Sequence, residues 1–130
     1  MKDIIFDNFQ NDVNESLLRH KSILDIITKY SESSSRVNRA IAKAVTNCGC
    51  IQICAEKQGI PSDETNDFNY ELSNHLKGTL CDNCREIIEN EIGNNLFYLT
   101  SLCNCLDLNL YDILLKEENK MSILGKFTLR

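Results

Sequence analysis

Two close pairs of cysteines constrain the fold of this chain more than any other feature. Cys48 and Cys50 form a Cys-Gly-Cys motif, and Cys81 and Cys84 form a Cys-Asp-Asn-Cys motif. Glycine, aspartate and asparagine are typical of turns, so both thiols of a pair can point to the same side. Two such turns offer four thiolates to one tetrahedral cation, and Zn²⁺ is the usual occupant of such a set. The sequence therefore predicts that two distant segments meet around one ion.

The chain contains seven cysteines. Cys54 follows the first pair closely and is a possible substitute ligand, whereas Cys103 and Cys105 fit an apolar helical pattern in which cysteine acts as a small core residue. Four thiolates fill a tetrahedral coordination sphere, so the expected zinc site is structural. An iron–sulfur cluster also needs only four cysteines, and a redox-active dithiol is a further alternative. These alternatives stay open at the level of sequence.

The two histidines are secondary candidates. His20 falls on the apolar side of a predicted helix, which is typical of a histidine at the edge of a core. His75 precedes the second cysteine pair and is a further possible ligand.

Length and charge limit the class of protein. We expect 130 residues to form a single helical domain, residues 1–130. The net charge of −5 argues against nucleic acid and membrane surfaces as partners, because both are anionic. The sequence has no apolar run of membrane-spanning length and no signal-peptide pattern near Met1, and its cysteine usage favours a reducing compartment. A cytoplasmic location is therefore expected.

Apolar residues recur at steps of three and four, and the chain has one proline. This pattern predicts an all-α fold, a four- to five-helix bundle that carries a cysteine-rich metal-binding insertion. The predicted helices cover residues 12–30, 35–46, 67–77, 84–106 and 110–120, with a serine-rich break at 31–35, cysteine turns at 47–54 and 79–84, and a polar tail at 122–130. Residues 51–54 have a short β-like pattern without an obvious partner and are expected to be irregular. The longest helix should bury a seam made of Ile88, Ile92, Leu96, Leu99, Cys103 and Leu106.

The second half of the chain resembles a known family. Residues 91–99 read Glu-Ile-Gly-Asn-Asn-Leu-Phe-Tyr-Leu, and residues 116–120 read Lys-Glu-Glu-Asn-Lys. Together they resemble the MazG-like nucleotide pyrophosphohydrolases over about residues 86–120, and the chain is also similar to short uncharacterised bacterial proteins with CGC and CxxC elements. The resemblance implies an all-α fold, a homo-oligomer, and Mg²⁺-dependent hydrolysis of nucleoside triphosphates to monophosphate and pyrophosphate.

The resemblance also implies two pairs of acidic ligands, and this chain departs from both. Glu91 matches the glutamate of one pair, but Asn94 stands where its aspartate partner belongs. The other pair has no counterpart in residues 35–44, where Arg36, Arg39 and Lys43 form a basic stripe instead. This stripe can bind phosphate or form a solvated helix face. Further acidic candidates are Glu86, Glu89, Asp107 and Asp112.

Three functions follow. The first is a zinc-stabilised MazG-like helical module without hydrolytic activity that binds a partner protein or a phosphorylated ligand. The second is a Mg²⁺-dependent nucleoside triphosphate pyrophosphohydrolase that draws on the acidic candidates above. The third is a redox sensor in which oxidation of the thiols releases zinc.

Overall fold

The computed structural model describes residues 2–17, 19, 21–58 and 72–124. Its elements are α1 (Lys2–Ser16), α2 (Ile23–Lys43), a π-helical turn η1 (Ala44–Cys48), β1 (Ile51–Ile53), β2 (Leu76–Gly78), α3 (Asp82–Cys105) and α4 (Leu110–Leu124). A mostly helical fold is thus confirmed. The strictly all-α prediction is wrong, because two short strands pair between α2 and α3.

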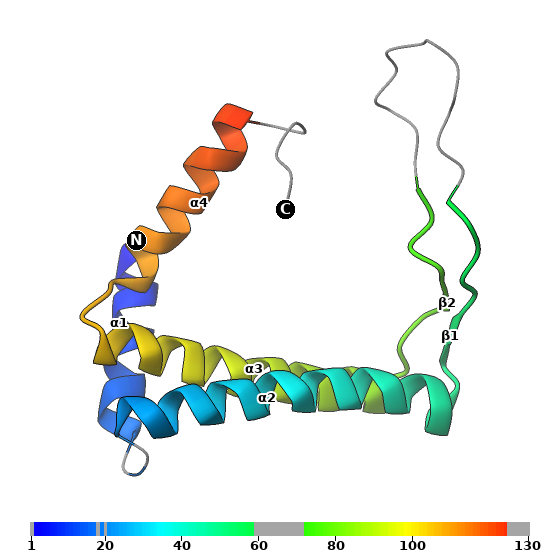
Figure 1. Ribbon diagram of the computed structural model, residues 1–130, viewed down its shortest axis with the longest axis horizontal. Helices are drawn as coiled ribbons and strands as arrows, with labels where there is room; N and C mark the ends of the chain where they lie inside the picture. The colour runs from blue at the N-terminus through cyan, green and yellow to red at the C-terminus, as the bar shows by residue number, and fades with distance from the viewer. Residues whose placement is uncertain (1, 18, 20, 59–71, 125–130) are drawn as a thin grey trace.

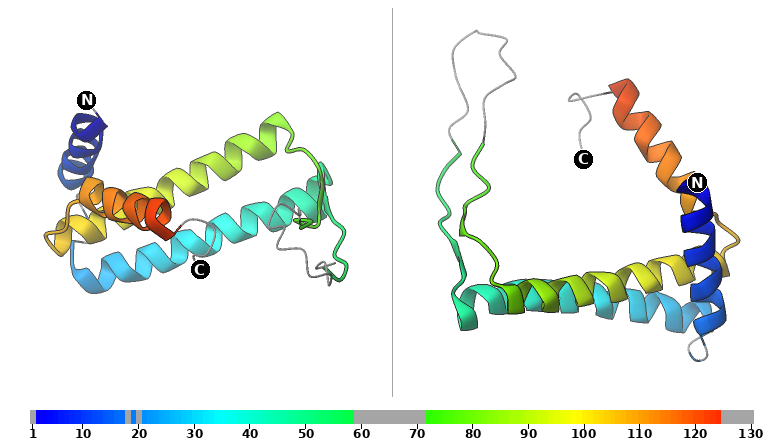
Figure 2. Two further views of the ribbon diagram at one scale, coloured as in Figure 1. Left: turned by 90° about the horizontal axis from the view of Figure 1, so that it is seen from above. Right: turned by 180° about the vertical axis from the view of Figure 1, so that it is seen from behind.

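The long helices α2 and α3 lie side by side and run in opposite directions (Figures 1 and 2). α1 crosses one end of this pair, and α4 rises from that same end, whereas the two strands rise from the other end (Figure 1). The cysteine turns therefore belong to the end of the molecule opposite α1.

One glutamine fixes α1 against the connection between α3 and α4. The Gln10 side chain donates a hydrogen bond to the Leu108 carbonyl oxygen at 2.7 Å and accepts one from the Leu110 backbone N–H at 2.9 Å. The Asn104 side chain donates to the Gln10 carbonyl oxygen at 3.0 Å. The Leu110 N–H at the start of α4 is thus satisfied by a side chain of α1, and the rings of Phe6 on α1 and Tyr111 on α4 are in contact, with centroids 5.8 Å apart.

The middle of the α2–α3 seam is polar. Asn95 on α3 donates hydrogen bonds to the hydroxyl oxygens of Ser33 at 3.0 Å and Ser34 at 2.9 Å. The Ser33 hydroxyl in turn donates to the Tyr30 carbonyl oxygen, and Ser33 is buried. Because these hydroxyls are satisfied inside a helix, α2 continues through residues 31–35. The predicted serine-rich break at that position is therefore wrong.

The real break lies between α1 and α2. Ser22 caps α2 by accepting a hydrogen bond from the Leu24 backbone N–H at 3.3 Å, and Asp25 lies in the first turn, where the helix dipole favours negative charge. The predicted first helix, residues 12–30, therefore spans parts of two helices.

The predicted seam of the longest helix is only partly correct. Ile88 and Cys103 are buried, but Ile92, Leu96 and Leu106 are exposed. α3 packs mainly against α2, so one narrow stripe is covered and the rest of its apolar face is open.

The segments around the cysteines also differ from expectation. Residues 51–53, expected to be irregular, form β1, which pairs in antiparallel fashion with β2. Within the predicted helix 67–77, residues 72–75 are not helical and β2 begins at Leu76, while residues 67–71 lie outside the described part of the chain. α4 extends to Leu124 and so includes the first residues of the predicted tail.

Replacing Asn95 tests the polar seam. We expect Asn95→Ala to lower the free energy of unfolding by about 1–3 kcal/mol, since the buried Ser33 hydroxyl loses a partner. The neighbouring Asn94 is exposed, so Asn94→Ala should change stability by less than about 0.5 kcal/mol. Chemical denaturation of both variants measures the difference, and equal effects would contradict the role given to Asn95.

Candidate metal centre

The first cysteine turn is formed by the way α2 ends. The helix widens into the π-helical turn η1, and the Gly49 backbone N–H then donates to the Ala44 carbonyl oxygen at 2.8 Å. Gly49 adopts a left-handed conformation, with φ of 79°, which glycine reaches without the strain a side chain would impose. The reversal leaves Cys48 and Cys50 on either side of it.

The second cysteine turn is a helix cap. Cys81 is the N-cap of α3, and its sulfur accepts a hydrogen bond from the Cys84 backbone N–H at 3.4 Å. The partial positive charge of a helix N-terminus favours a thiolate at this position. The prediction that this turn feeds a helix N-terminus is therefore confirmed.

The two-stranded ladder brings the turns together. β1 follows the first turn and β2 precedes the second, so that Ile51 pairs with Gly78 directly beside both cysteine pairs. Gly78 has a φ of 89°, and a Cβ atom there would lie 2.5 Å from the Cys50 carbonyl oxygen. Only glycine permits this approach of the two chain segments.

The four sulfurs form a compact cluster. The Sγ atoms of Cys48, Cys50, Cys81 and Cys84 all lie within 4.8 Å of one another, and those of Cys48 and Cys81 are 3.7 Å apart. A tetrahedron with metal–sulfur bonds of about 2.3 Å separates its sulfurs by about 3.8 Å, so the spacing suits a single tetrahedral ion. The predicted grouping of these four cysteines is confirmed, and they can hold a metal ion.

A small apolar core supports the cluster. Ala44, Ile51, Cys84 and Ile88 are buried against one another. Burial of the four cysteines is graded, since Cys84 is buried, Cys50 and Cys81 are half-buried, and Cys48 is exposed. The cluster thus rests on the core with one edge open to solvent.

The sulfurs differ in acidity. Hydrogen bonds from the Cys84 backbone N–H and the Cys84 thiol lower the pKa of Cys81 to about 7. The same thiol contact with Cys81, followed by burial, raises the pKa of Cys84 to about 12. The first negative charge of the metal-free cluster therefore resides on Cys81, and a bound cation displaces protons from the other thiols.

The other sulfur and imidazole candidates lie apart from the cluster or outside the described residues. Cys54 is exposed beyond β1, where its backbone N–H donates to the His75 carbonyl oxygen at 2.8 Å. Cys54 and His75 line a separate hollow of about 150 Å³, and neither belongs to the four-sulfur group. His20 lies outside the described residues. Cys103 is buried as expected, whereas Cys105 is exposed.

The acidic candidates do not assemble into a second cluster. Glu86 and Glu89 are exposed on α3, and Glu91 is half-buried in a groove between α2 and α3. Among the described residues, the four cysteines are the one group of three or more cysteine, histidine, aspartate or glutamate side chains arranged to hold a metal ion. Asp107, which follows α3, and Asp112, on α4, belong to no such group.

The three basic residues do come together. Arg36, Arg39 and Lys43 line the same groove as Glu91, with a volume of about 560 Å³. Asn94 lies at a neighbouring hollow that also includes Arg36.

No protein-family model, curated protein or solved structure matches this chain. Within the described residues, no helix has the length and apolar character needed to cross a membrane.

Substitution of Gly78 tests whether the ladder positions the cysteines. We expect Gly78→Ala to weaken metal affinity by about 10–100-fold, as loss of a supporting contact around a metal site typically does. Gly93→Ala is the matched control, because Gly93 is helical with open space at its Cβ position, and it should keep full affinity. Competition with a chromogenic chelator measures both. Unchanged affinity in Gly78→Ala would contradict this role.

Proposed function

We propose that this chain is a helical module in which Cys48, Cys50, Cys81 and Cys84 hold one structural zinc ion. The module acts by binding a partner protein or a phosphorylated ligand, without hydrolysing nucleotides. The observation that carries the proposal is the gathering of four sulfurs within 4.8 Å.

Zinc suits this set better than an iron–sulfur cluster. In a [4Fe–4S] cluster each cysteine ligates a different iron, and in a [2Fe–2S] cluster two cysteines ligate each of two irons. Both arrangements spread the cysteine sulfurs more widely than a single ion does. A close set of four soft thiolates matches one Zn²⁺ and leaves no open position for a substrate or an activated water. The metal therefore serves the fold.

The position of the sulfurs means that the ion would stabilise the fold by linking two chain segments. Cys48 is the last residue of η1, which continues α2, and Cys81 is the N-cap of α3. The ion therefore links the C-terminal end of α2 to the N-terminal end of α3. Structural zinc contributes about 10–16 kcal/mol to folding in small domains, comparable with the whole stability of a typical protein.

Hydrolysis is disfavoured by the charges of the groove. Mg²⁺ needs carboxylate oxygens, and Arg36 and Arg39 stand where the MazG-like resemblance requires acids. Asn94 further removes one negative charge. We infer that a MazG-like fold is retained without the Mg²⁺-dependent reaction, and pyrophosphohydrolase activity is the alternative.

A redox role is the second alternative, favoured by the exposed Cys48 beside Cys81. Oxidation by hydrogen peroxide would join the two metal-bound thiolate sulfurs in a disulfide, because the two electrons they give up, with two protons from water, reduce the peroxide to two water molecules. The loss of two thiolate ligands would expel the metal. Peroxide treatment that leaves the metal bound would argue against this role.

We also propose that the chain forms a homo-oligomer. The large apolar side chains exposed on α4 are Ile113, Leu114, Leu115, Met121 and Ile123, and α1 exposes Ile4 and Ile5. α4 rises away from the α2–α3 pair, with α1 as its principal packing partner (Figure 1). An apolar surface of this extent is typical of an interface, and a second copy offers the same helices in return.

Elemental analysis of untagged protein tests the zinc proposal. We expect about one zinc per chain, and loss of that zinc in Cys81→Ser and Cys84→Ser. Both variants should also unfold at markedly lower temperature or denaturant concentration, because the metal contributes to folding. Cys54→Ser and Cys105→Ser are matched controls that should retain zinc. Wild-type protein without metal, or equal loss in the controls, would refute the proposal.

Light scattering coupled to size exclusion tests the oligomer. We expect a mass of at least two chains for wild-type protein, and dissociation when Leu114→Glu and Met121→Glu are combined, since each buries a charge at the interface. Lys116→Glu, an exposed polar position on the same helix, should leave the mass unchanged. A monomeric wild-type protein at micromolar concentration would exclude this part of the proposal.

A further inference from the structure

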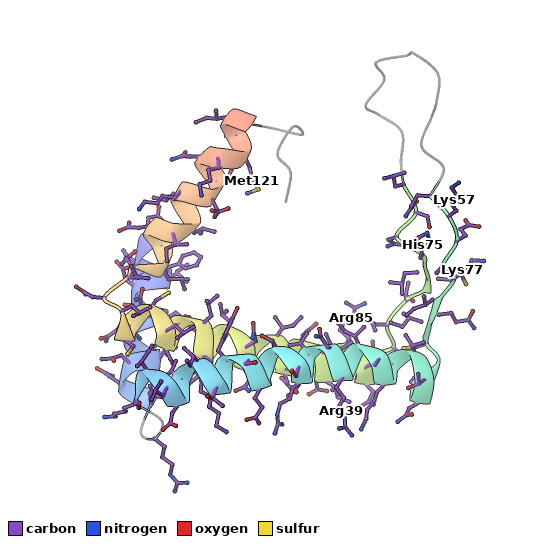
Figure 3. The ribbon with its side chains drawn as sticks, viewed as in Figure 1. Arg39, Lys57, His75, Lys77, Arg85 and Met121 are labelled. Atoms are coloured by element: carbon purple, nitrogen blue, oxygen red, sulfur yellow. The ribbon has the colours of Figure 1, made fainter. Side chains whose placement is uncertain are left out.

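The groove between α2 and α3 has a volume of about 560 Å³, and its basic side chains outnumber its acidic ones. Arg36, Arg39 and Lys43 lie along one side of α2 at steps of three and four residues. Ile87 and Glu91 form the α3 wall. Figure 3 shows Arg39 projecting from the face of the helical pair opposite to the one from which α4 and the strands rise. This surface is distinct from the sulfur cluster.

The three cations are not equally neutralised. Arg36 pairs with Glu32 at 3.2 Å, and this pair lowers the pKa of Glu32 together with the stronger effect of Lys29. Arg39 and Lys43 have no ion pair among the described residues. They are one helical turn apart, where like charges repel. An anion placed between them would relieve this repulsion.

We propose that this groove binds a phosphorylated small molecule, with the phosphate held between Arg39 and Lys43. The inference rests on the proposed role as a binding module and names the class of its ligand. A guanidinium group matches two phosphate oxygens at once, and an ammonium group adds a second charge-assisted contact. Arg36, already paired, borders the site and shares its positive field.

The other residues that line the groove indicate the chemistry of the rest of the ligand. Ala40 and Ile87 give the groove an apolar floor that suits a ring or an aliphatic part. Glu91 offers a carboxylate on the opposite wall, which accepts a hydrogen bond from a hydroxyl or amino group and repels a second phosphate. A volume of about 560 Å³ fits one small molecule.

The overall charge of the chain disfavours a long polyanion as the ligand. A net charge of −5 repels an extended nucleic acid, whereas a small ligand meets only the local field of the groove. These charges favour a discrete phosphomonoester over an extended polyanion.

Calorimetric titration of the full, metal-loaded chain tests the site, with inorganic phosphate and phenyl phosphate as probes. We expect phenyl phosphate to bind more tightly than inorganic phosphate, because the ring contacts Ile87 and Ala40. The double variant Arg39→Gln, Lys43→Gln should weaken binding by at least about tenfold, since both charge-assisted contacts are lost. The control Lys57→Gln, Lys116→Gln removes the same charge elsewhere and should stay within about twofold of wild type.

Two results would overturn the inference. One is the absence of binding by either probe at millimolar concentration. The other is an equal loss in the control, which would mean that overall charge alone attracts the anion. Amide chemical shifts provide a second readout, with changes expected at residues 36–43 and 87–91.

Failure of the zinc proposal can be distinguished from failure of the phosphate-site proposal. If the protein contains no metal but phenyl phosphate still binds in the groove, the zinc assignment falls and the ligand site stands. If zinc is present and the probes do not bind, the reverse holds.

Discussion

The meeting of four sulfurs at the open end of the α2–α3 pair is the contact on which the rest of the structure depends. The far end of the pair is held by α1, whose Gln10 bonds to the α3–α4 connection. The middle is held by polar contacts from Asn95 to Ser33 and Ser34. At the cysteine end of the pair, only a few apolar residues are buried. A two-stranded ladder of three residues per strand is only marginally stable by itself. A cross-link through a cation would supply what this end lacks.

The sulfurs also carry out a second task. Cys81 caps α3, so its sulfur satisfies a backbone N–H of the first helical turn. A thiolate bound to a cation keeps lone pairs free for this hydrogen bond. Coordination of an ion by Cys81 would therefore reinforce its capping of α3, since one sulfur would serve both contacts. Gly78 makes this possible, because its lack of a side chain lets β2 approach the Cys50 carbonyl group.

The grouping of the cysteines was predictable because its causes are local. Gly49 permits a left-handed turn, and the spacing of Cys81 and Cys84 fits a helix N-terminus. The continuous helix through the serines was not predictable, since Asn95 lies far away in sequence and satisfies their hydroxyls only after folding. The ladder was missed for the same reason. Its signals were the β-like pattern of residues 51–53 and a glycine at position 78, but only pairing in space joins them.

The error in the predicted seam of α3 has a different cause. Periodicity shows that a helix has an apolar face, but it does not show which chain covers that face. Ile92 and Leu96 continue the apolar pattern that begins at the buried Ile88, yet both are exposed, because α2 covers only one stripe of α3. The same is true of Leu114 and Met121 on α4. The sequence thus encodes more apolar surface than one copy of these helices buries. Exposed apolar area costs free energy in water, and this cost is the physical basis of the proposed association of chains.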